Sequence, residues 1–497
     1  MRMMPDLDSI RSHLAAGKAT LMHTELVADL ETPVSIMLKL GIDSPYHCLL
    51  ESVEGGNVRG RFSVIALDPD LIWTVQGETI TTHDGDGNLI AEETGHAFDH
   101  LRRLMAASAI DIPNDLPPMS AGLFGYFGYE MIRYMENIPN RNPDELNTPS
   151  SCLMRPSVVV IIDRLKDSMR IVTPIRPDSR QGDHEAAISD ASSRLQRIID
   201  KLGAALPSRA KPENHPPLPE VTANMSKSSY LDMVKKAIDY IKAGDIFQVV
   251  LSQRFSVPFF KHPFTLYRSL RRLNPSPFLI YFNMGGLSLV GSSPEILVRL
   301  REGKVTIRPI AGTRPRGKTP EEDQALAKDL LSDAKERAEH LMLLDLGRND
   351  VGRVSKPGTV KVVDHFNIER YSHVMHIASE VQGEARVECD AIDALKAGFP
   401  AGTLTGAPKI RAMEIIDELE PTQRGPYGGA AGYISGNGDM DTCIVLRTAL
   451  IKDDMLHIQA GAGVVYDSVD ENEFQECVNK AMAVIRAAAE AVEMTED

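Results

Sequence analysis

Residues 433–466 have the sequence YISGNGDMDTCIVLRTALIKDDMLHIQAGAGVVY. Strand-forming residues flank Asn437-Gly438, a dipeptide that is typical of a two-residue hairpin turn. A further pair of strand-like runs follows directly in the chain. Because turns this short can join only antiparallel neighbours, the segment predicts an antiparallel sheet.

Similar runs occur on both sides of this segment and extend the prediction to most of the chain. They are separated by glycine, aspartate and asparagine, and the Asp-Gly pairs at 84–85 and 86–87 predict another hairpin. The predicted strands lie at 46–53, 61–68, 71–90, 157–164, 278–284, 287–293, 295–300 and 304–310. Helical patterns occur between them, so we expect an α+β fold in which two antiparallel β-sheets pack as a sandwich with helices on the outside.

Composition narrows the class of protein. The chain has 497 residues, with 54 Lys+Arg against 69 Asp+Glu, and its formal net charge is −15. A chain this acidic is a poor general nucleic-acid binder. The five cysteines are scattered and form no C-x-x-C pair, which predicts neither disulfides nor a zinc site. No apolar run approaches the length of a membrane span, so we expect a cytoplasmic protein.

A proline-rich stretch divides the chain. Residues 203–220, GAALPSRAKPENHPPLPE, contain five prolines and few apolar residues, a composition that is typical of a connecting segment. We therefore expect an N-terminal region at 1–202, a connector at 203–225 and a C-terminal region at 226–497.

Two predicted helices carry pairs of glutamates spaced three residues apart, which places each pair on one helix face. We predict the first helix over residues 319–346, with Thr319 as N-cap and Glu322 completing a capping box, and the second over 470–492. Each pair alone is also typical of an exposed helix face. If the pairs meet, their oxygens form a site that suits Mg²⁺. The pairs are Glu336 with Glu339, and Glu473 with Glu476.

Glycine-rich segments at 400–409 (PAGTLTGAPK) and 461–465 (GAGVV) are predicted as flexible loops whose backbone N–H groups could approach an anion. Ordinary turns explain these glycines equally well. Neither segment has a P-loop or dinucleotide-binding pattern, so a nucleotide site is poorly supported.

Several motifs in one order resemble the chorismate-utilising enzymes. They are GDIFQVVLSQR, NPSPFLIYF, GSSPEILVR, PIAGTRPRG, EHLMLLDLGRNDVGRV, PAGTLTGAPK and a final E-x-x-E-x-x-x-K, with CLLES and GLFGYFGYE near the N-terminus. The resemblance covers nearly the whole chain. It is greatest to the large aminase subunits of the family, which add ammonia to ring carbon 2 of chorismate, expel the 4-hydroxyl and eliminate pyruvate to leave anthranilate.

The resemblance assigns roles that the residue types can meet. Hydroxide is a poor leaving group and needs a proton donor, which would be Glu295. His376 is at the position of the family's catalytic histidine, with His373 as a nearby alternative. Thr403 and Lys480 complete the expected catalytic set.

The resemblance also implies a magnesium ion and a binding site for the two carboxylates of chorismate. Mg²⁺ would be held by Glu339 and Glu476, with Glu336 and Glu473 in support. The expected substrate-binding residues are Gln248, Gly312, Thr313, Tyr427, Arg447, Gly461, Ala462 and Gly463.

Two positions separate the branches of the family. Water-adding members resemble this chain but carry a lysine base where this sequence has Gln248, so ammonia is the expected nucleophile. Aminodeoxychorismate synthases commonly carry a nucleophilic lysine where this sequence has Ala311. Since some of them lack that lysine, aminodeoxychorismate synthase component I stays an alternative.

Finally, the resemblance implies regulation and a partner. The expected L-tryptophan inhibitor site comprises Leu50, Glu51, Ser52, Asn274, Pro275, Pro277, Phe278 and Leu279. The sequence lacks a glutaminase motif, so use of glutamine requires an amidotransferase subunit in a hetero-oligomer. A non-catalytic tryptophan sensor is a further alternative, which the retained catalytic residues disfavour.

Overall fold

The computed structural model describes residues 3–54, 58–207, 217–371 and 374–494. Part of the predicted connector (208–216) and the alternative histidine His373 lie outside these residues. The helices are α1 Leu7–Ala15, α2 Pro33–Leu40, α3 Ala97–Ser108, α4 His184–Gly203, α5 Lys227–Ala243, α6 Pro263–Leu273, α7 Pro320–Ser332, α8 Ala334–Gly352, α9 Ala391–Gly398, α10 Gly402–Thr405, α11 Lys409–Leu419 and α12 Asp470–Glu493.

The strands outnumber the helices. They are β1 Thr20–Val27, β2 His47–Glu54, β3 Val58–Gln76, β4 Thr79–Asp84, β5 Leu89–Thr94, β6 Gly122–Phe127, β7 Ser151–Asp163, β8 Ser168–Ile175, β9 Thr222–Ala223, β10 Gln248–Pro258, β11 Phe278–Asn283, β12 Leu287–Ser293, β13 Ile296–Arg301, β14 Lys304–Ile307, β15 Ile310–Pro315, β16 Lys361–Arg370, β17 Val374–Glu384, β18 Gly406–Ala407, β19 Ala430–Ser435, β20 Met440–Ile444, β21 Thr448–Lys452 and β22 Met455–Val464.

Every strand pairing in the described part of the chain is antiparallel, as the hairpin at 433–466 predicts. In that segment β19 pairs with β20 and β21 pairs with β22. The pairings connect all the described strands into one hydrogen-bonded network. The division into two packed sheets stays a prediction.

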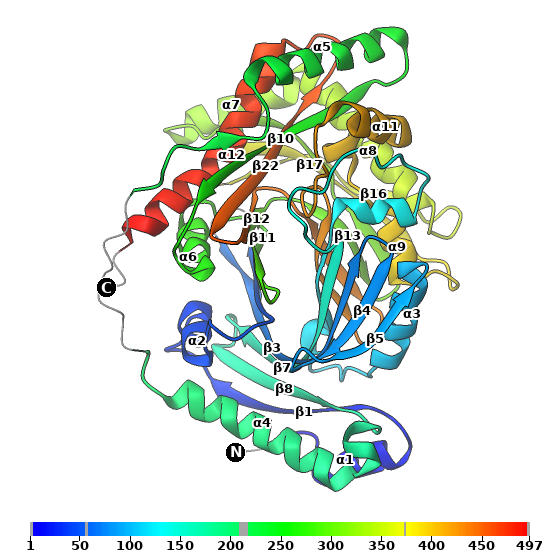
Figure 1. The fold of residues 1–497 in the computed structure, drawn as a ribbon, viewed down its shortest axis with the longest axis vertical. Helices are drawn as coiled ribbons and strands as arrows, with labels where there is room; N and C mark the ends of the chain where they lie inside the picture. Colours follow the sequence, from blue (N-terminus) through cyan, green and yellow to red (C-terminus); the bar gives the residue numbers. More distant parts are fainter. Residues whose placement is uncertain (1–2, 55–57, 208–216, 372–373, 495–497) are drawn as a thin grey trace.

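Helices cover the outside of this network (Figure 1). Helices α1 and α4 lie along β1 and β8 at one end of the molecule, and α5 and α12 lie beside β10 and β22 at the other. No helix in the described ranges is long and apolar enough to cross a membrane.

The regions on either side of the connector share one sheet network and one core. Strand β2 pairs with β11, and β6 pairs with β19, so strands from before residue 203 are inserted between strands from after it. The largest apolar cluster likewise contains Leu195 of α4, Val249 of β10 and Ile485 of α12. The two regions therefore do not form separate hydrophobic cores, even if their functions differ.

Several local predictions were wrong. The helix predicted over 319–346 is two helices, because the Asp333 carboxylate accepts backbone hydrogen bonds from Lys335 and Glu336 and caps the start of α8. Glu322 bonds to the N–H of Lys318, so the predicted capping box is not closed. Strands predicted at 61–68 and from 71 are one strand, β3, with an irregular register between Pro69 and Leu71.

Candidate active site

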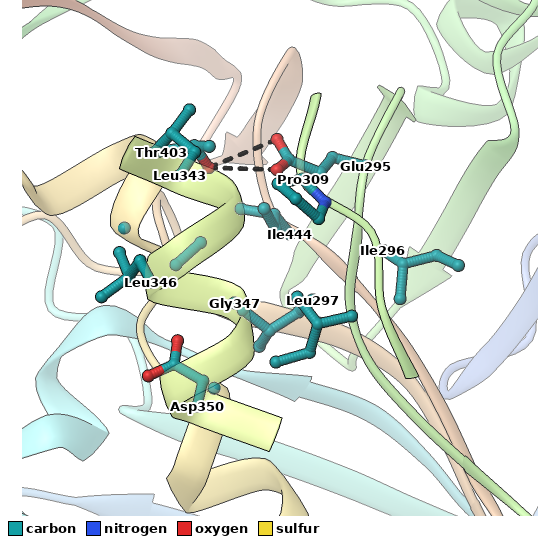
Figure 2. Close-up of a pocket in the computed structure, with 14 residues that line it drawn as sticks. Glu295, Ile296, Leu297, Pro309, Leu343, Leu346, Gly347, Asp350, Thr403 and Ile444 are labelled. Carbon is teal, nitrogen blue, oxygen red and sulfur yellow. Dashed lines mark hydrogen bonds between the residues drawn. The ribbon is translucent and has the colours of Figure 1, made fainter. Parts of the chain in front are cut away.

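Glu295 lies between β12 and β13 with its side chain buried. Its two carboxylate oxygens each lie 3.3 Å from the Thr403 hydroxyl, which is on the short helix α10, and Figure 2 shows the two groups facing each other. Burial raises the pKa of Glu295 to about 8, against opposing contributions from Thr403 and Arg447. Glu295 is therefore mostly protonated at neutral pH and can donate a proton.

A small cavity of about 30 Å³ adjoins Glu295. Most of its lining is apolar, and α8 and β13 contribute part of it, including Leu297, Leu343 and Leu346. At its other end, Asp350 accepts a hydrogen bond of 2.9 Å from Lys409. The mostly apolar residues around the Glu295 carboxyl bury it, and this burial raises its pKa.

His376 lies on β17, opposite Thr313 of β15. The two strands are out of register at Gly312, whose φ of 72° turns its carbonyl toward the imidazole. His376 Nδ1 lies 2.9 Å from the Gly312 oxygen and 3.0 Å from Thr313 Oγ1. A carbonyl can only accept, so Nδ1 carries the proton and Nε2 keeps its lone pair. Burial and the charge of Arg447 lower the pKa of His376 to about 4, which leaves it neutral and basic near pH 7.

Arg447 follows β20 and has a backbone φ of 49°. Burial lowers its pKa, while the nearby Tyr371 and Glu295 act in the opposite direction. No acidic group of the described residues forms an ion pair with its guanidinium. A half-buried guanidinium in this state can bind a carboxylate through two parallel hydrogen bonds. Electrostatic coupling between Arg447 and both Glu295 and His376 places the three groups in one site.

Gly461, Ala462 and Gly463 lie in β22 and pair with β10, so the prediction of a flexible loop there was wrong. Close approach restricts position 461 most, because a Cβ there would lie 2.8 Å from the Leu251 carbonyl oxygen, whereas at position 463 only a flexible side chain is in the way. A Cβ on Gly461 would lie 3.0 Å from Tyr427 Oη, and one on Gly463 would lie 2.6 Å from Gln248 Nε2. The segment 400–409 is also ordered, since it forms α10, β18 and the start of α11.

Lys480 and the four glutamates lie on two helices: Glu336 and Glu339 on α8, and Glu473, Glu476 and Lys480 on α12. The Lys480 ammonium donates to the Gly461 carbonyl at 2.9 Å and pairs with Glu476 at 2.8 Å. Glu336 lies 3.2 Å from Arg314. Burial raises the pKa of Glu339, and the negative charges of Glu336 and Glu476 raise it further. The glutamates of α8 and α12 are thus close enough to repel one another.

The donor set fits a hard divalent cation, because all four donors are carboxylates and the negative charges of Glu336 and Glu476 act on Glu339. In the described ranges, no three histidine, cysteine, aspartate or glutamate side chains converge closely enough to hold a metal. A cation between α8 and α12 would therefore be held by pairs of carboxylates and by water, and not by a closed protein cage.

The expected tryptophan-binding residues are brought together by strand pairing. Leu50, Glu51 and Ser52 lie in β2, and Leu279 of β11 is directly opposite Glu51. Phe278 begins β11, while Asn274, Pro275 and Pro277 connect α6 to it. Asn274 also donates a hydrogen bond of 3.4 Å to the Ala483 carbonyl of α12.

Sequence reasoning missed the partners of Glu51. This buried carboxylate forms ion pairs with Arg164 and Arg271 and accepts a hydrogen bond of 2.7 Å from Tyr267. Burial opposes its ionisation, but Arg271, Tyr267 and Arg164 outweigh burial and lower the pKa of Glu51. An incoming ammonium group would have to share or displace these guanidinium contacts. No local signal marks them, since the partners are more than 100 residues away in sequence.

The family of chorismate binding enzymes matches residues 48–486. The chain belongs to this family. Anthranilate synthase component 1 of Cereibacter sphaeroides is 53% identical over 491 residues, covering 98% of each chain. That of Acetivibrio thermocellus is 45% identical and covers 99% of each.

Solved structures agree with this assignment. Anthranilate synthase component I from Streptococcus pneumoniae superposes with a TM-score of 0.76 at 37% identity, covering 86% of this chain and 92% of that one. The menaquinone-specific isochorismate synthase from Escherichia coli has a TM-score of 0.71 at 18% identity and covers 97% of this chain and 98% of that one. The second likeness concerns the fold alone. This chorismate-binding enzyme therefore shares its fold with proteins named for different reactions.

Proposed function

We propose that this chorismate-binding enzyme is the large subunit of an anthranilate synthase, which converts chorismate and ammonia to anthranilate and pyruvate. The observation that carries the proposal is the buried, mostly protonated Glu295, held by Thr403 in the same site as the neutral His376 and the unpaired Arg447. The relatives named for this reaction support it, since they match the chain at nearly full length.

In the first step, ammonia adds to ring carbon 2 of chorismate and the ring double bonds shift. The carbon–oxygen bond at position 4 breaks, and Glu295 gives its proton to the departing hydroxyl so that water leaves. Burial among mostly apolar residues raises the pKa of Glu295 and so favours the protonated carboxyl before this step. In the second step, Nε2 of His376 removes the proton from carbon 2. The enolpyruvyl group takes up a proton and leaves as pyruvate, and the ring becomes aromatic.

The two substrate carboxylates need separate positive partners. Arg447 would bind the enolpyruvyl carboxylate, beside Tyr427 and the strand at Gly461 to Gly463. Mg²⁺, when bound by Glu339 and Glu476 with Glu336 and Glu473 in support, supplies charge neutralisation for the ring carboxylate. Lys480 lies between the two, because it contacts both Glu476 and the Gly461 carbonyl.

Gln248 and Ala311 support ammonia as nucleophile and carbon 2 as its target. Gln248 donates to Glu339 at 3.4 Å and is no base for water. Ala311 is packed in β15 opposite Ile377, so the covalent lysine route is closed at that position. We further propose a cytoplasmic hetero-oligomer with a glutamine amidotransferase. In it, region 1–202 contributes to a site for the inhibitor L-tryptophan and region 226–497 carries catalysis.

The test is a fluorescence assay for anthranilate with the purified chain, chorismate, MgCl₂ and ammonium salt at about pH 8. We expect turnover with ammonium and none with glutamine alone, because the partner amidotransferase is absent. A product that lacks anthranilate fluorescence would point to the 4-amino isomer, and absence of any product would favour a sensor.

A further inference from the structure

A buried ion pair lies behind the candidate active site. Arg424 follows α11, and Glu420 is at the end of that helix. Their side chains are 1% and 2% exposed. The Glu420 carboxylate accepts from Arg424 Nε at 2.9 Å and from Nη2 at 2.6 Å. The reaction steps above use neither residue.

The remaining side-chain hydrogen bonds of the pair reach segments that line the candidate site. Arg424 Nη1 donates to the Leu404 carbonyl at 2.7 Å, directly after Thr403. Its Nη2 donates to the Val250 carbonyl of β10 at 2.8 Å. Glu420 accepts from both the N–H and the hydroxyl of Ser252 at 2.8 Å. Ser252 and Val250 are directly opposite Gly461 and Gly463 in the ladder with β22.

The guanidinium also packs on an aromatic ring of the site. Its central carbon lies 5.5 Å from the ring centroid of Tyr427, whose hydroxyl approaches Gly461. The backbone N–H of Arg424 donates at 3.0 Å to the buried carboxyl of Glu130, which belongs to the segment after β6. The guanidinium of Arg424 thus contacts α10, β10 and Tyr427, which come from three separate parts of the chain.

Stability does not explain this arrangement. Removing two charges from water costs about as much as their attraction returns, so buried ion pairs contribute little net stability. A rigid guanidinium with its donors all engaged does fix geometry, which a lysine ammonium on a flexible stem does not.

We propose that Arg424, held by Glu420, is a positioning residue that sets Thr403 against Glu295 and Tyr427 against Gly461. This inference rests on the proposed function. It predicts that loss of the guanidinium fork impairs turnover even when the fold is kept, because the Thr403 hydroxyl moves away from the carboxyl of the proton donor.

Arg424→Lys keeps the charge and removes the fork. We expect kcat with ammonium to fall by roughly 100-fold, the order of loss that a displacement of about 1 Å causes. Arg424→Met combined with Glu420→Gln removes both charges and leaves an acceptor for Ser252, so it should fold and show the same loss. Asp417→Asn is the matched control: Asp417 is a buried carboxylate in the last turn of α11, and its ion-pair partners are Arg133 at 3.1 Å and Arg141, neither of which belongs to the candidate site. Its kcat should stay within about twofold of the parent.

The pH profile separates positioning from a general loss of folded protein. Thr403 donates to Glu295 and thereby favours the ionised carboxylate. Loss of that donation should move the alkaline limb of kcat to higher pH in Arg424→Lys, as in Thr403→Val. The Thr403→Val/Arg424→Lys double variant should show no further movement. The other charged or titratable groups near Glu295 are Arg447 and Tyr371, with Asp350 on the same cavity, and all are unchanged in these variants.

A second readout does not need turnover. The urea midpoint of unfolding is measured against pH for each protein with Glu295 and with Glu295→Gln. The difference between the two midpoints reports the ionisation of Glu295 in the folded state. In the Arg424→Lys background this curve should move to higher pH. If the parent makes no anthranilate but the curve moves, the proposed function fails and the positioning role stands. Three results for Arg424→Lys would overturn the positioning role. They are a stability curve that does not move, a kcat equal to that of the parent, and a lowered kcat whose alkaline limb stays at the same pH.

Discussion

Replacing Glu295 with glutamine should make the protein more stable at neutral pH while removing its activity. In the folded chain, burial raises the pKa of Glu295 to about 8, compared with an ordinary value of 4.5. Folding at pH 7 therefore requires this carboxyl to take up a proton that the unfolded chain has released. A glutamine amide has nearly the same shape, can still accept from Thr403, and has no proton to take up.

The magnitude follows from the pKa values. The interval from pH 4.5 to pH 7 is about 2.5 pH units, and each unit corresponds to about 1.36 kcal/mol. At pH 7 the free energy of unfolding of the parent is therefore lowered by about 3 kcal/mol, and that of Glu295→Gln is not. The sign is that of a carboxyl whose pKa is raised by folding. The parent has its full stability below pH 4.5 and loses stability as the pH rises toward about 8. The advantage of the variant should therefore vanish near pH 4.5 and grow through pH 7.

Urea unfolding followed by fluorescence at pH 5, 6, 7 and 8 measures this difference. Glu321→Gln is the control, because its parent carboxyl is exposed on α7, and its stability at pH 7 should differ from that of the parent by much less than about 3 kcal/mol. Turnover of Glu295→Gln with ammonium should fall by about 10²- to 10⁴-fold, the usual contribution of a general acid. A variant that is less stable than the parent at pH 7, or a difference that does not depend on pH, would refute the argument that Glu295 is held protonated.

Four further predictions concern the metal, the base and the inhibitor site. Glu339→Gln should abolish Mg²⁺-dependent turnover while circular dichroism stays unchanged, and retained activity would refute its role as a ligand. The acid limb of kcat should lie near pH 4 and not near 6.5, because burial lowers the pKa of His376 to about 4 and the base works only when neutral; a limb near 6.5 would contradict this. Glu51→Gln should lower the free energy of unfolding by about 3–5 kcal/mol, since it leaves two guanidinium groups short of a partner, and a loss under 1 kcal/mol in urea melts would count against it. Ser52→Arg should weaken inhibition by tryptophan with little change in uninhibited turnover, and an unchanged inhibition curve would exclude the site.

The sequence predicts those elements whose signals are local. Ser226 and Gly244 are residue types that typically begin and end a helix, and in the structure they cap α5, with Gly244 in the left-handed conformation. The hairpin at Asn437-Gly438 forms for the same reason: its turn residues are adjacent in the chain.

Features that depend on tertiary contacts were not predictable. Asp333 looked like an ordinary residue inside a long helix, but the structure uses it to end α7 and to cap α8. Gly461 looked like a loop residue, because nothing in its neighbourhood reveals that β10 and the Tyr427 hydroxyl approach it. The guanidinium partners of Glu51 are likewise set only by the fold.

The candidate site was likewise predictable only in part: its residues could be selected from motifs, but their protonation could not. Resemblance to the family selects Glu295, His376 and Arg447, and the structure places these side chains within one site. Neither the raised pKa of Glu295 nor the lowered pKa of His376 is encoded in the motifs. Both arise from burial, which depends on how α8, β15 and β17 pack around the site.

The position of nitrogen in the product tests the central claim most directly. The purified chain is supplied with chorismate, MgCl₂ and ¹⁵N-ammonium, and the product is examined by NMR. Our account predicts ¹⁵N on the ring carbon next to the one that bears the carboxyl group, together with one pyruvate per ring. Nitrogen at the carbon opposite the carboxyl group, or a product without ¹⁵N, would contradict it.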